Sequence, residues 1–241
     1  MAETALIPLD LSQLPSTQIG TDDDFAQIAK GAEFLGRLQL FTKGKAINKG
    51  LVRPGHYGIP ESDDEIIDLG DCVDILPLAR RTKAIDMSDN EAIVVSYDFK
   101  NPEFQRIQAA ADTPESGCMF GPSFLVIERS SGRFLEFFCG NKSSRGESKK
   151  LFPYLPLSEE DIRQKGLVDQ KPHGPIPVTL KSKLVETRSF SWHAPVVVKC
   201  STPFTRLPAN EVILREITKF LTIKDNGVEK AKDEGRKQRA R

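Results

Sequence analysis

Short apolar runs separated by turn residues dominate the hydrophobic pattern of this 241-residue chain. In the segment RLQLFTKGKAINKGLVRPGHYGI, Leu38 and Leu40 alternate with polar neighbours, which predicts a hairpin or meander with basic loops. Residues 72–78 and 91–99 each have the composition of a strand. Residues 123–138, SFLVIE-RSSG-RFLEFF, predict two strands joined by a glycine-containing turn. Both are apolar on both faces, so we expect a central hairpin between two layers.

Helical periodicity is confined to a few segments. A short helix is predicted from Thr21 or Asp22, because either residue can cap it and acidic residues occupy its first turn. Residues 101–111 and 158–164 fit short helices as well. The segment LPANEVILREITKFLTI predicts a C-terminal helix docked on a core. Its apolar stripe consists of Val212, Ile213, Ile217, Phe220 and Leu221.

Residues 177–202 contain three further strand-like segments, which brings the total to seven to nine short strands with frequent turn signals. This pattern predicts a mainly β protein of the α+β type, an OB-like barrel or sandwich with long loops and helices near its ends. We expect an extended arm over 1–20 and a single domain over 21–224 with an insertion at 151–176. A mobile charged tail is expected over 225–241.

The composition limits the classes of partner. Lysine plus arginine equals aspartate plus glutamate, so the formal net charge is zero and offers no bulk attraction to nucleic acid or membrane. The four cysteines are widely spaced and form no CxxC pair, which favours reduced thiols over disulfides or zinc. Neither a secretory signal nor an apolar run of membrane-spanning length occurs, so we expect a cytoplasmic protein without a cofactor.

Three candidate chemistries are each matched by a simpler interpretation. The acidic run 61–74 could hold a divalent cation, but it lacks a calcium-loop spacing, and a solvated acidic turn is favoured. Cys139 could act as a nucleophile with one of the three histidines, but a packed thiol is favoured. GNKSSRG, residues 140–146, does not match a phosphate-binding loop. The carboxylates considered for a metal are Asp63, Asp64, Glu65, Asp68 and Asp71.

Basic residues interleaved with aromatic residues form the remaining candidate. Single-stranded nucleic acid is bound by cations that follow its backbone and by rings on which bases stack. The candidate cations are Lys43, Lys45, Lys49, Arg53, Lys142, Arg145, Lys149, Lys150, Lys181, Lys183 and Arg188. The candidate stacking faces are Tyr57, Phe138 and Trp192. On this interpretation FFCGNKSSRGESKK is a strand that leaves the core into a loop that contacts the nucleic-acid backbone.

The order RLQLFTKGKAINKG, RPGHYGIP, LGDCVDILPLARRTKAID, GCMFGPSFLVIERSSGRFLEFFCGNKSSR and SFSWHAPVVVKCSTPF resembles an uncharacterised type of protein from tailed phages. Such proteins are similar in size and plan to phage-encoded single-stranded-DNA-binding proteins built on an OB-type barrel. Many of those end in an acidic tail that competes with DNA and recruits replication partners. Here the tail ends in basic residues, which puts an acidic-tail mechanism in doubt.

The resemblance and the basic-aromatic pattern together predict a non-enzymatic single-stranded-DNA-binding protein of a phage replication or recombination module. Its partners would be single-stranded DNA and replication or recombination proteins, and an oligomer is compatible with this function. The alternative is a structural, assembly or interaction protein of the virion, since the arm, the insertion and the tail suit contacts between subunits. A metal-dependent nuclease that uses the carboxylates of 61–74 ranks third.

Overall fold

A nine-stranded sheet forms the centre of the computed structural model, which describes residues 35–89, 92–113, 115–167, 169–187, 191–202, 204 and 207–223. The predicted arm, N-terminal helix and charged tail lie outside these residues. The strands are β1 (Gly36–Leu40), β2 (Tyr57–Pro60), β3 (Ile66–Gly70), β4 (Cys72–Asp89), β5 (Ala92–Ser96), β6 (Cys118–Glu128), β7 (Phe134–Phe138), β8 (Val178–Glu186) and β9 (Ser191–Lys199). A mainly β fold is therefore confirmed.

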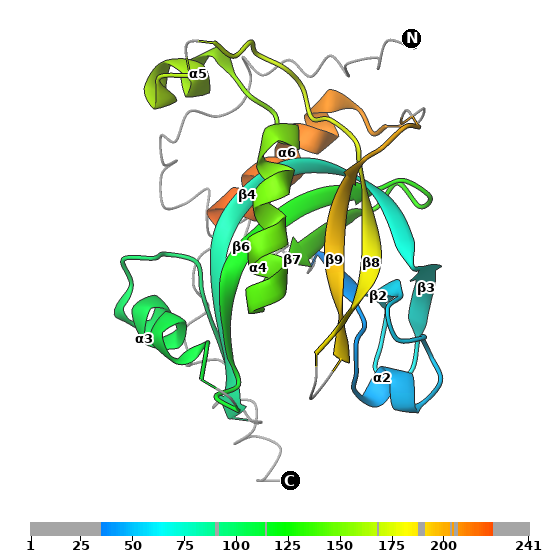
Figure 1. Ribbon diagram of the computed structural model, residues 1–241. Helices are drawn as coiled ribbons and strands as arrows, with labels where there is room; N and C mark the ends of the chain where they lie inside the picture. The colour runs from blue at the N-terminus through cyan, green and yellow to red at the C-terminus, as the bar shows by residue number, and fades with distance from the viewer. Residues whose placement is uncertain are drawn as a thin grey trace, which may run out of the picture.

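The strands run in the order β3-β2-β1-β7-β6-β4-β8-β9, and β5 pairs with β4 (Figure 1). The β1–β7 pair is parallel and the other pairs are antiparallel. The sheet curls so that β2 comes close to β8, and the Tyr57 hydroxyl on β2 donates a hydrogen bond to the Lys181 carbonyl on β8. Among the described strands, however, β3 and β9 at the ends of this order do not pair with each other. The sheet is thus open, and the OB-like closure is not confirmed.

Strand β4 is the longest strand and changes partner along one edge. Its first edge pairs with β6 from Ile75 to Asp86. Its second edge pairs with β8 only over residues 72–75 and with β5 only from residue 84 onward. Residues 76–83 of this second edge therefore have no strand partner within the described part of the chain. A gap of this kind leaves backbone groups of a central strand open to other ligands.

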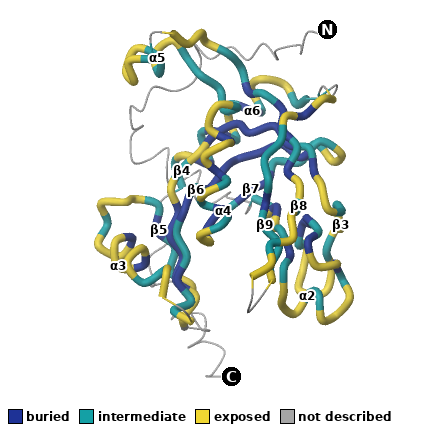
Figure 2. The backbone as a smooth tube through the Cα atoms, viewed as in Figure 1, coloured by how far each residue is buried: buried dark blue, intermediate teal, exposed yellow. Residues whose placement is uncertain are grey.

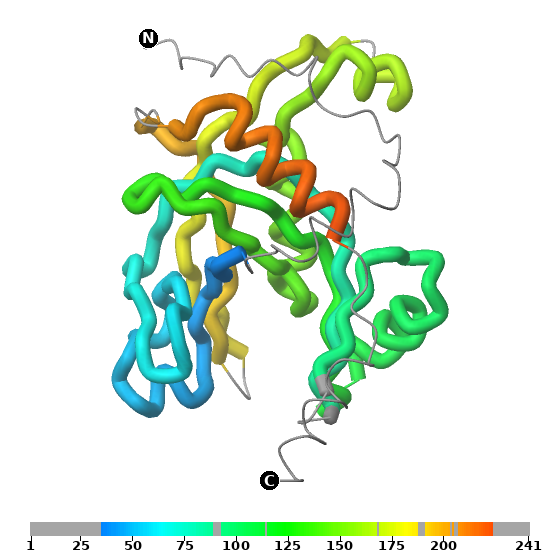
Figure 3. Tube along the Cα trace, turned by 180° about the vertical axis from the view of Figure 1, so that it is seen from behind, coloured from blue at the N-terminus to red at the C-terminus, as the bar shows by residue number. Residues whose placement is uncertain are grey.

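Helices cover both faces of the sheet. They are α2 (Lys45–Asn48), α3 (Pro102–Ala110), α4 (Lys142–Ser148), α5 (Glu159–Lys165), α6 (Asn210–Thr222) and the 3-10 helix η2 (Lys149–Tyr154). The helices expected over 101–111, 158–164 and at the C-terminal end are confirmed. Asn101, Asn141 and Ser158 cap α3, α4 and α5 through side-chain oxygens that accept hydrogen bonds from backbone N–H groups. Figure 1 shows α4 in front of β4 and β6, and Figure 3, from behind, shows α6 crossing the opposite face.

Two sequence-based expectations need correction. The basic stretch after Phe138 is not an extended loop, because Asn141 accepts a hydrogen bond from the Ser144 amide and starts α4. Residues 177–202 form two nine-residue strands, β8 and β9, where three short strands were expected. The segment 151–176, predicted to be an insertion, begins with Leu151 of η2, which is fully buried. Asn141 thus starts a helix in the basic stretch that was expected to be a loop contacting nucleic acid.

Figure 2 shows that buried residues concentrate along the central strands, and their side chains form separate clusters on the two faces of the sheet. The inner face, which carries η2, packs residues of β1, β2, β4, β6, β7 and β8 around Phe124 and Leu151. The outer face packs α6 against β4 and β6 through Ile213, Ile217 and Phe220. A third cluster places α3 on the inner face of β4 and β6, near Ala84 and Cys118, and also against β5. These clusters hold α3 and α4 on the same face of β4 and β6.

A charged cluster lies on the outer face below the end of α6. Glu136 of β7 accepts hydrogen bonds from Lys83 at 2.5 Å, from Ser123 at 2.6 Å and from Arg81 at 3.3 Å. The Arg81 guanidinium lies 3.8 Å from the centroid of the Tyr97 ring and 4.2 Å from that of Phe220. This cluster links three neighbouring strands at a buried position.

Candidate functional site

A cleft of about 680 Å³ lies on the inner face, bounded by α3, α4, η2 and the open edge of β4. Aromatic and cationic side chains line it, and no carboxylate is among the described residues that do so. The aromatic residues are Phe99, Phe104, Phe120 and Phe152, and the cations are Arg80, Arg81, Arg145 and Lys149. Its volume is in the range of sites that hold small organic ligands.

The gap in β4 exposes backbone donors at the base of this cleft. The Met87 amide donates a hydrogen bond to the carbonyl of Gly117, the residue before β6. Because successive strand residues alternate, Lys83, Ile85 and Met87 direct their backbone groups toward β6. By the same alternation, Arg80 and Thr82 direct their N–H and carbonyl groups to the unpaired second edge of β4, which borders the cleft. The Thr82 hydroxyl donates to the Tyr97 carbonyl, which fixes the wall beside Phe99. The cleft therefore combines backbone and side-chain donors.

Two of the phenylalanines present ring surface to solvent. Phe99 is 61% exposed and Phe152 is 37% exposed. The Arg80 guanidinium lies 4.1 Å from the centroid of Phe152, and the ring of Phe152 tilts at 45° to that of buried Phe124. A cation held over an aromatic ring in this way creates a flat surface on which a planar group can stack. Burial lowers the pKa of Arg80, but its guanidinium stays charged at neutral pH.

The four cations that line the cleft differ in their environment. Arg145 lies 4.2 Å from the centroid of Phe120, donates to the carbonyls of Phe120 and Gly140 and pairs with Asp112 at 2.6 Å. Arg80 and Lys149, in contrast, have no carboxylate at ion-pair distance in the part of the chain that the structure describes. Arg81 is engaged on the outer face. Uncompensated positive charge in the cleft therefore comes mainly from Arg80 and Lys149.

Only two of the cations selected from the sequence, Arg145 and Lys149, line this cleft. Lys43, Lys45, Lys49 and Arg53 are exposed around α2, which Figure 1 shows far from α3. The remaining described cations are Lys142 on α4, Lys150 on η2, and Lys181 and Lys183 on β8, all exposed. Arg188 lies outside the described residues. The cleft thus gathers a smaller set of cations than the sequence suggested.

The predicted stacking faces are placed differently from one another. Tyr57 is 0% exposed and packs in the inner core, where burial raises the pKa of its hydroxyl, so the structure contradicts its role as a stacking face. Phe138 is partly exposed on the outer face, with Lys83 Nζ 5.4 Å from its centroid. Trp192 is partly exposed, and its indole N–H donates to the Ser143 hydroxyl at 3.2 Å. None of the three lines the cleft.

The acidic run and Cys139 have structural roles. Asp64 pairs with Lys49, and both carboxylate oxygens of Asp68 bond to His56, so part of the acidic run neutralises the basic α2 region. No group of three or more His, Cys, Asp or Glu side chains in the described residues is arranged to hold a metal ion. Cys139 is fully buried, which raises the pKa of its thiol and confirms the prediction of a packed cysteine. A thiol held protonated at neutral pH is a poor nucleophile.

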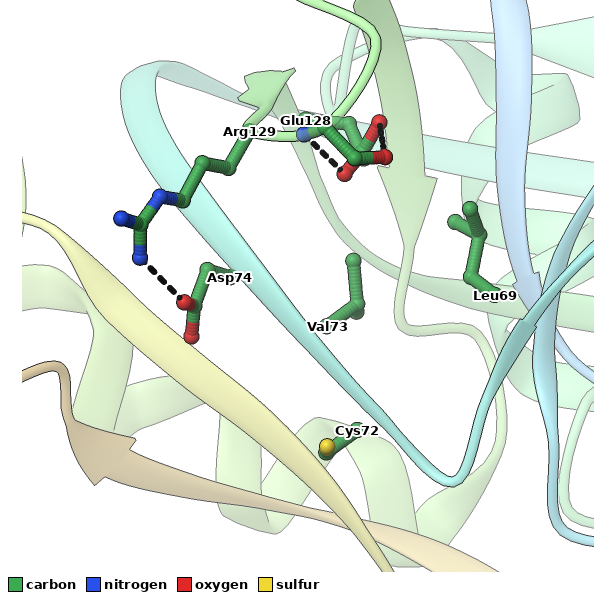
Figure 4. Close-up of a pocket in the computed structure, with 7 residues that line it drawn as sticks. Leu69, Cys72, Val73, Asp74, Glu128 and Arg129 are labelled. Carbon is green, nitrogen blue, oxygen red and sulfur yellow. Dashed lines mark hydrogen bonds and ion pairs between the residues drawn. The ribbon is translucent and has the colours of Figure 1, made fainter. Parts of the chain in front are cut away.

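A second, smaller cavity of about 290 Å³ lies at the start of β4 (Figure 4). Asp74 accepts a hydrogen bond from Arg129 at 2.9 Å, and Glu128 accepts hydrogen bonds from Ser130 and Ser131. Figure 4 shows exposed Cys72 at the opposite side of the cavity, where burial and Asp71 raise the pKa of its thiol. The polar groups here already bond to one another, so the larger cleft is the stronger candidate site.

The residues that sequence analysis missed come from four separate segments. Arg80 follows a predicted strand, Phe99 and Phe120 flank α3, and Phe152 lies in a stretch that was interpreted as a connection. The adjacent residues Arg80 and Arg81 were the one local signal of a cationic site. On a strand their side chains point to opposite faces, and the sequence does not show which of them faces the cleft. Only the packing of α3 and η2 on the inner face brings these side chains together.

None of the described helices is long and apolar enough to cross a membrane. Searches for similarity to family models, curated proteins and solved structures find no match to this chain. The function is therefore inferred from the residues and the geometry of the cleft.

Proposed function

We propose that this protein binds single-stranded DNA without catalysing a reaction on it, and that the cleft between α3 and α4 accepts the DNA. The observation that carries this proposal is the pairing of exposed phenyl rings with uncompensated cations in one cleft that has no carboxylate among its described lining residues. Single strands expose both bases and phosphates, and this combination of groups recognises both. A phage replication or recombination module is the setting that we propose.

Each chemical group of the cleft has a defined role in this model. Bases stack on Phe99 and on Phe152, the second of which is backed by Arg80. Phosphates contact Arg80 and Lys149, and the backbone N–H groups of β4 supply further donors. Arg145 is already bonded to Asp112 and to two carbonyls, so it orients Phe120 more than it binds a phosphate. Stacking therefore contributes more to affinity than charge does.

The salt dependence of binding distinguishes this model from binding by a broad basic surface. Two phosphate contacts predict a slope of log K against log salt of about −1.4 for a single strand. Engagement of the α2 lysines and of the β8 lysines as well would make the slope several times steeper. A shallow slope follows from the small number of cations in the cleft that are free to contact phosphates.

Fluorescence anisotropy with a labelled oligothymidylate at several salt concentrations tests the proposal. Phe152→Ala removes a stacking face, and we expect a loss of about 1–3 kcal/mol, or about 5- to 150-fold in affinity. The matched pair of double variants is Arg80→Gln with Lys149→Gln in the cleft, and Lys43→Gln with Lys45→Gln at α2. The first pair should weaken binding at least tenfold and the second should not. Absence of binding at low salt refutes the function, whereas loss only in the α2 pair refutes the site.

A further inference from the structure

The sheet has three outer strand edges, and two of them are protected. The outer edge of β9 is covered by α4, since the Val197 amide donates to Glu147 at 3.0 Å. The edge strand β3 carries an exposed carboxylate, Asp68, in its middle. Charged residues and covering helices are the usual means by which proteins prevent edge-to-edge association. Among the described residues, the third edge, that of β5, has neither a charged side chain on its strand nor a helix bonded to it.

Strand β5 has the sequence AIVVS, without a charged residue, and β4 is its one strand neighbour in the described chain. Val94 and Ser96 lie opposite Asp86 and Ala84, the β4 residues whose backbone groups point away from β6. By alternation, the backbone N–H and carbonyl groups of Ile93 and Val95 point to the outer edge. Helix α3 packs on the face that carries Val94, not on this edge.

The outer face of the same hairpin presents apolar surface. Ile93 is 59% exposed and Met87, which follows Ile85 by two residues on β4, is 42% exposed. Ile85 is opposite Val95 in the register, so these side chains lie on one face, opposite α3. An apolar patch beside an uncharged free strand edge is typical of an interaction surface.

We propose that β5 pairs in antiparallel orientation with β5 of a second copy of this chain. A strand edge is complementary to itself under a two-fold axis, because each outward N–H then meets an outward carbonyl. Centring the register on Val94 places Ile93 opposite Val95 of the second copy and forms about four backbone hydrogen bonds. No charge on the strand opposes this contact, and the zero net charge of the chain removes long-range repulsion between copies.

The size of the strand sets the strength of the dimer. A five-residue edge with a small apolar patch belongs at the low end of specific interfaces, below about 1,200 Å². We therefore expect a dissociation constant of about 1–100 µM. A two-fold axis perpendicular to the joined sheets leaves both α3 faces on the same side, so the two clefts open in one direction. The dimer itself is independent of any nucleic acid.

Sedimentation velocity of the full chain without nucleic acid, from about 1 to 200 µM, tests this inference. We expect the sedimentation coefficient of the native chain to rise from the monomer to the dimer value over this range. Ile93→Lys should raise the dissociation constant at least tenfold, and Val95→Pro should do the same, since it removes an outward N–H but no bond to β4. Ile67→Lys, an equivalent change on the edge strand β3, is the control and should leave the dimer unchanged.

Three outcomes overturn the inference: a native chain that stays monomeric throughout, an Ile93→Lys variant that dimerises as the native chain does, or an Ile67→Lys variant that becomes monomeric. Circular dichroism and thermal melting of each variant establish that it is folded. If Val95→Pro fails to fold, Ile93→Lys alone decides, because its side chain is exposed and its backbone is unchanged.

Discussion

The Glu136 carboxylate allows a quantitative test of how the sheet is stabilised. Its side chain is 9% exposed and neutralises two cations, Lys83 and Arg81, at a similar depth. Glu136→Gln removes the negative charge and leaves both cations buried without it. Breaking a buried ion pair costs about 3–5 kcal/mol. Since glutamine still accepts a hydrogen bond, we expect a loss of about 3 kcal/mol in unfolding free energy at pH 7, which lowers Tm by about 6–12 °C.

The pH dependence of this loss carries a distinct signature. Burial raises the pKa of Glu136, but Lys83, Ser123 and Arg81 more than offset this effect and hold the pKa below its usual value. The carboxylate therefore stabilises the native chain above its unfolded pKa, and this contribution is lost as the pH falls through the folded pKa. Burial lowers the pKa of Lys83 despite the carboxylate, and Glu136→Gln lowers it further. The unfolded pKa of Lys83 is about 10.4. Between its lower folded pKa in the variant and this value, the unfolded chain binds more protons than the folded chain, so raising the pH stabilises the variant.

Urea unfolding at pH 5, 7 and 9.5, monitored through the single tryptophan, Trp192, measures these effects. The control is Glu160→Gln, which removes an exposed pair with Arg163 and should cost less than about 0.5 kcal/mol. The unfolding free energy of Glu136→Gln should approach that of the native chain at pH 9.5. A loss below about 1 kcal/mol at pH 7, or a difference that does not change with pH, would refute the reasoning.

Three shorter predictions concern residues that support the cleft or the sheet beneath it. Burial raises the pKa of Asp86, but bonds from Ser88 and Arg106 lower it to about 2. Its contribution, about 2 kcal/mol by the size of this shift, is present above its unfolded pKa of 3.8 and disappears as the pH falls to about 2. Asp86→Asn should therefore show a smaller decrease in Tm between pH 5 and pH 2.5 than the native chain. Gly121→Ala places a Cβ 2.1 Å from the Cys139 carbonyl oxygen, so we expect a lower yield of folded protein and a lower Tm by differential scanning fluorimetry. Ile217→Ala removes a buried side chain between α6 and the sheet and should cost about 2–5 kcal/mol in urea unfolding.

Local patterns were sufficient for much of the secondary structure. The β6–β7 hairpin, α3 and α6 follow from turn residues, capping residues and an apolar stripe, all of which act over a few neighbours. The length of β4 was not predictable, because Arg80, Arg81 and Lys83 interrupt the apolar run of a strand that continues through them. Their charges are accommodated by Glu136 and by aromatic rings from distant segments. Only tertiary contacts make these residues compatible with a central strand.

The candidate site was less predictable than the fold. Charge clustering in the sequence pointed to α2, but Lys49 is paired there with the acidic run that precedes β4. Tyr57 was selected as an aromatic residue near basic turns, yet its alternation within β2 places it in the core. Lys149, which was also selected from the sequence, lines the cleft because it directly follows α4, the helix that Asn141 caps. At Lys49, an opposite charge nearby in the sequence thus provides an ion-pair partner within the chain.

Helix α4 connects the cleft to the β8–β9 hairpin. One side of it supplies Gly146 and Ser148 to the cleft, while Glu147 and Ser143 bond to β9. A ligand that immobilises this helix must also slow hydrogen–deuterium exchange at the Val197 amide. By thermodynamic reciprocity, detaching the hairpin from the helix reduces retention of that ligand by the same factor. A single backbone proton on β9, a strand that does not line the cleft, can therefore report occupancy.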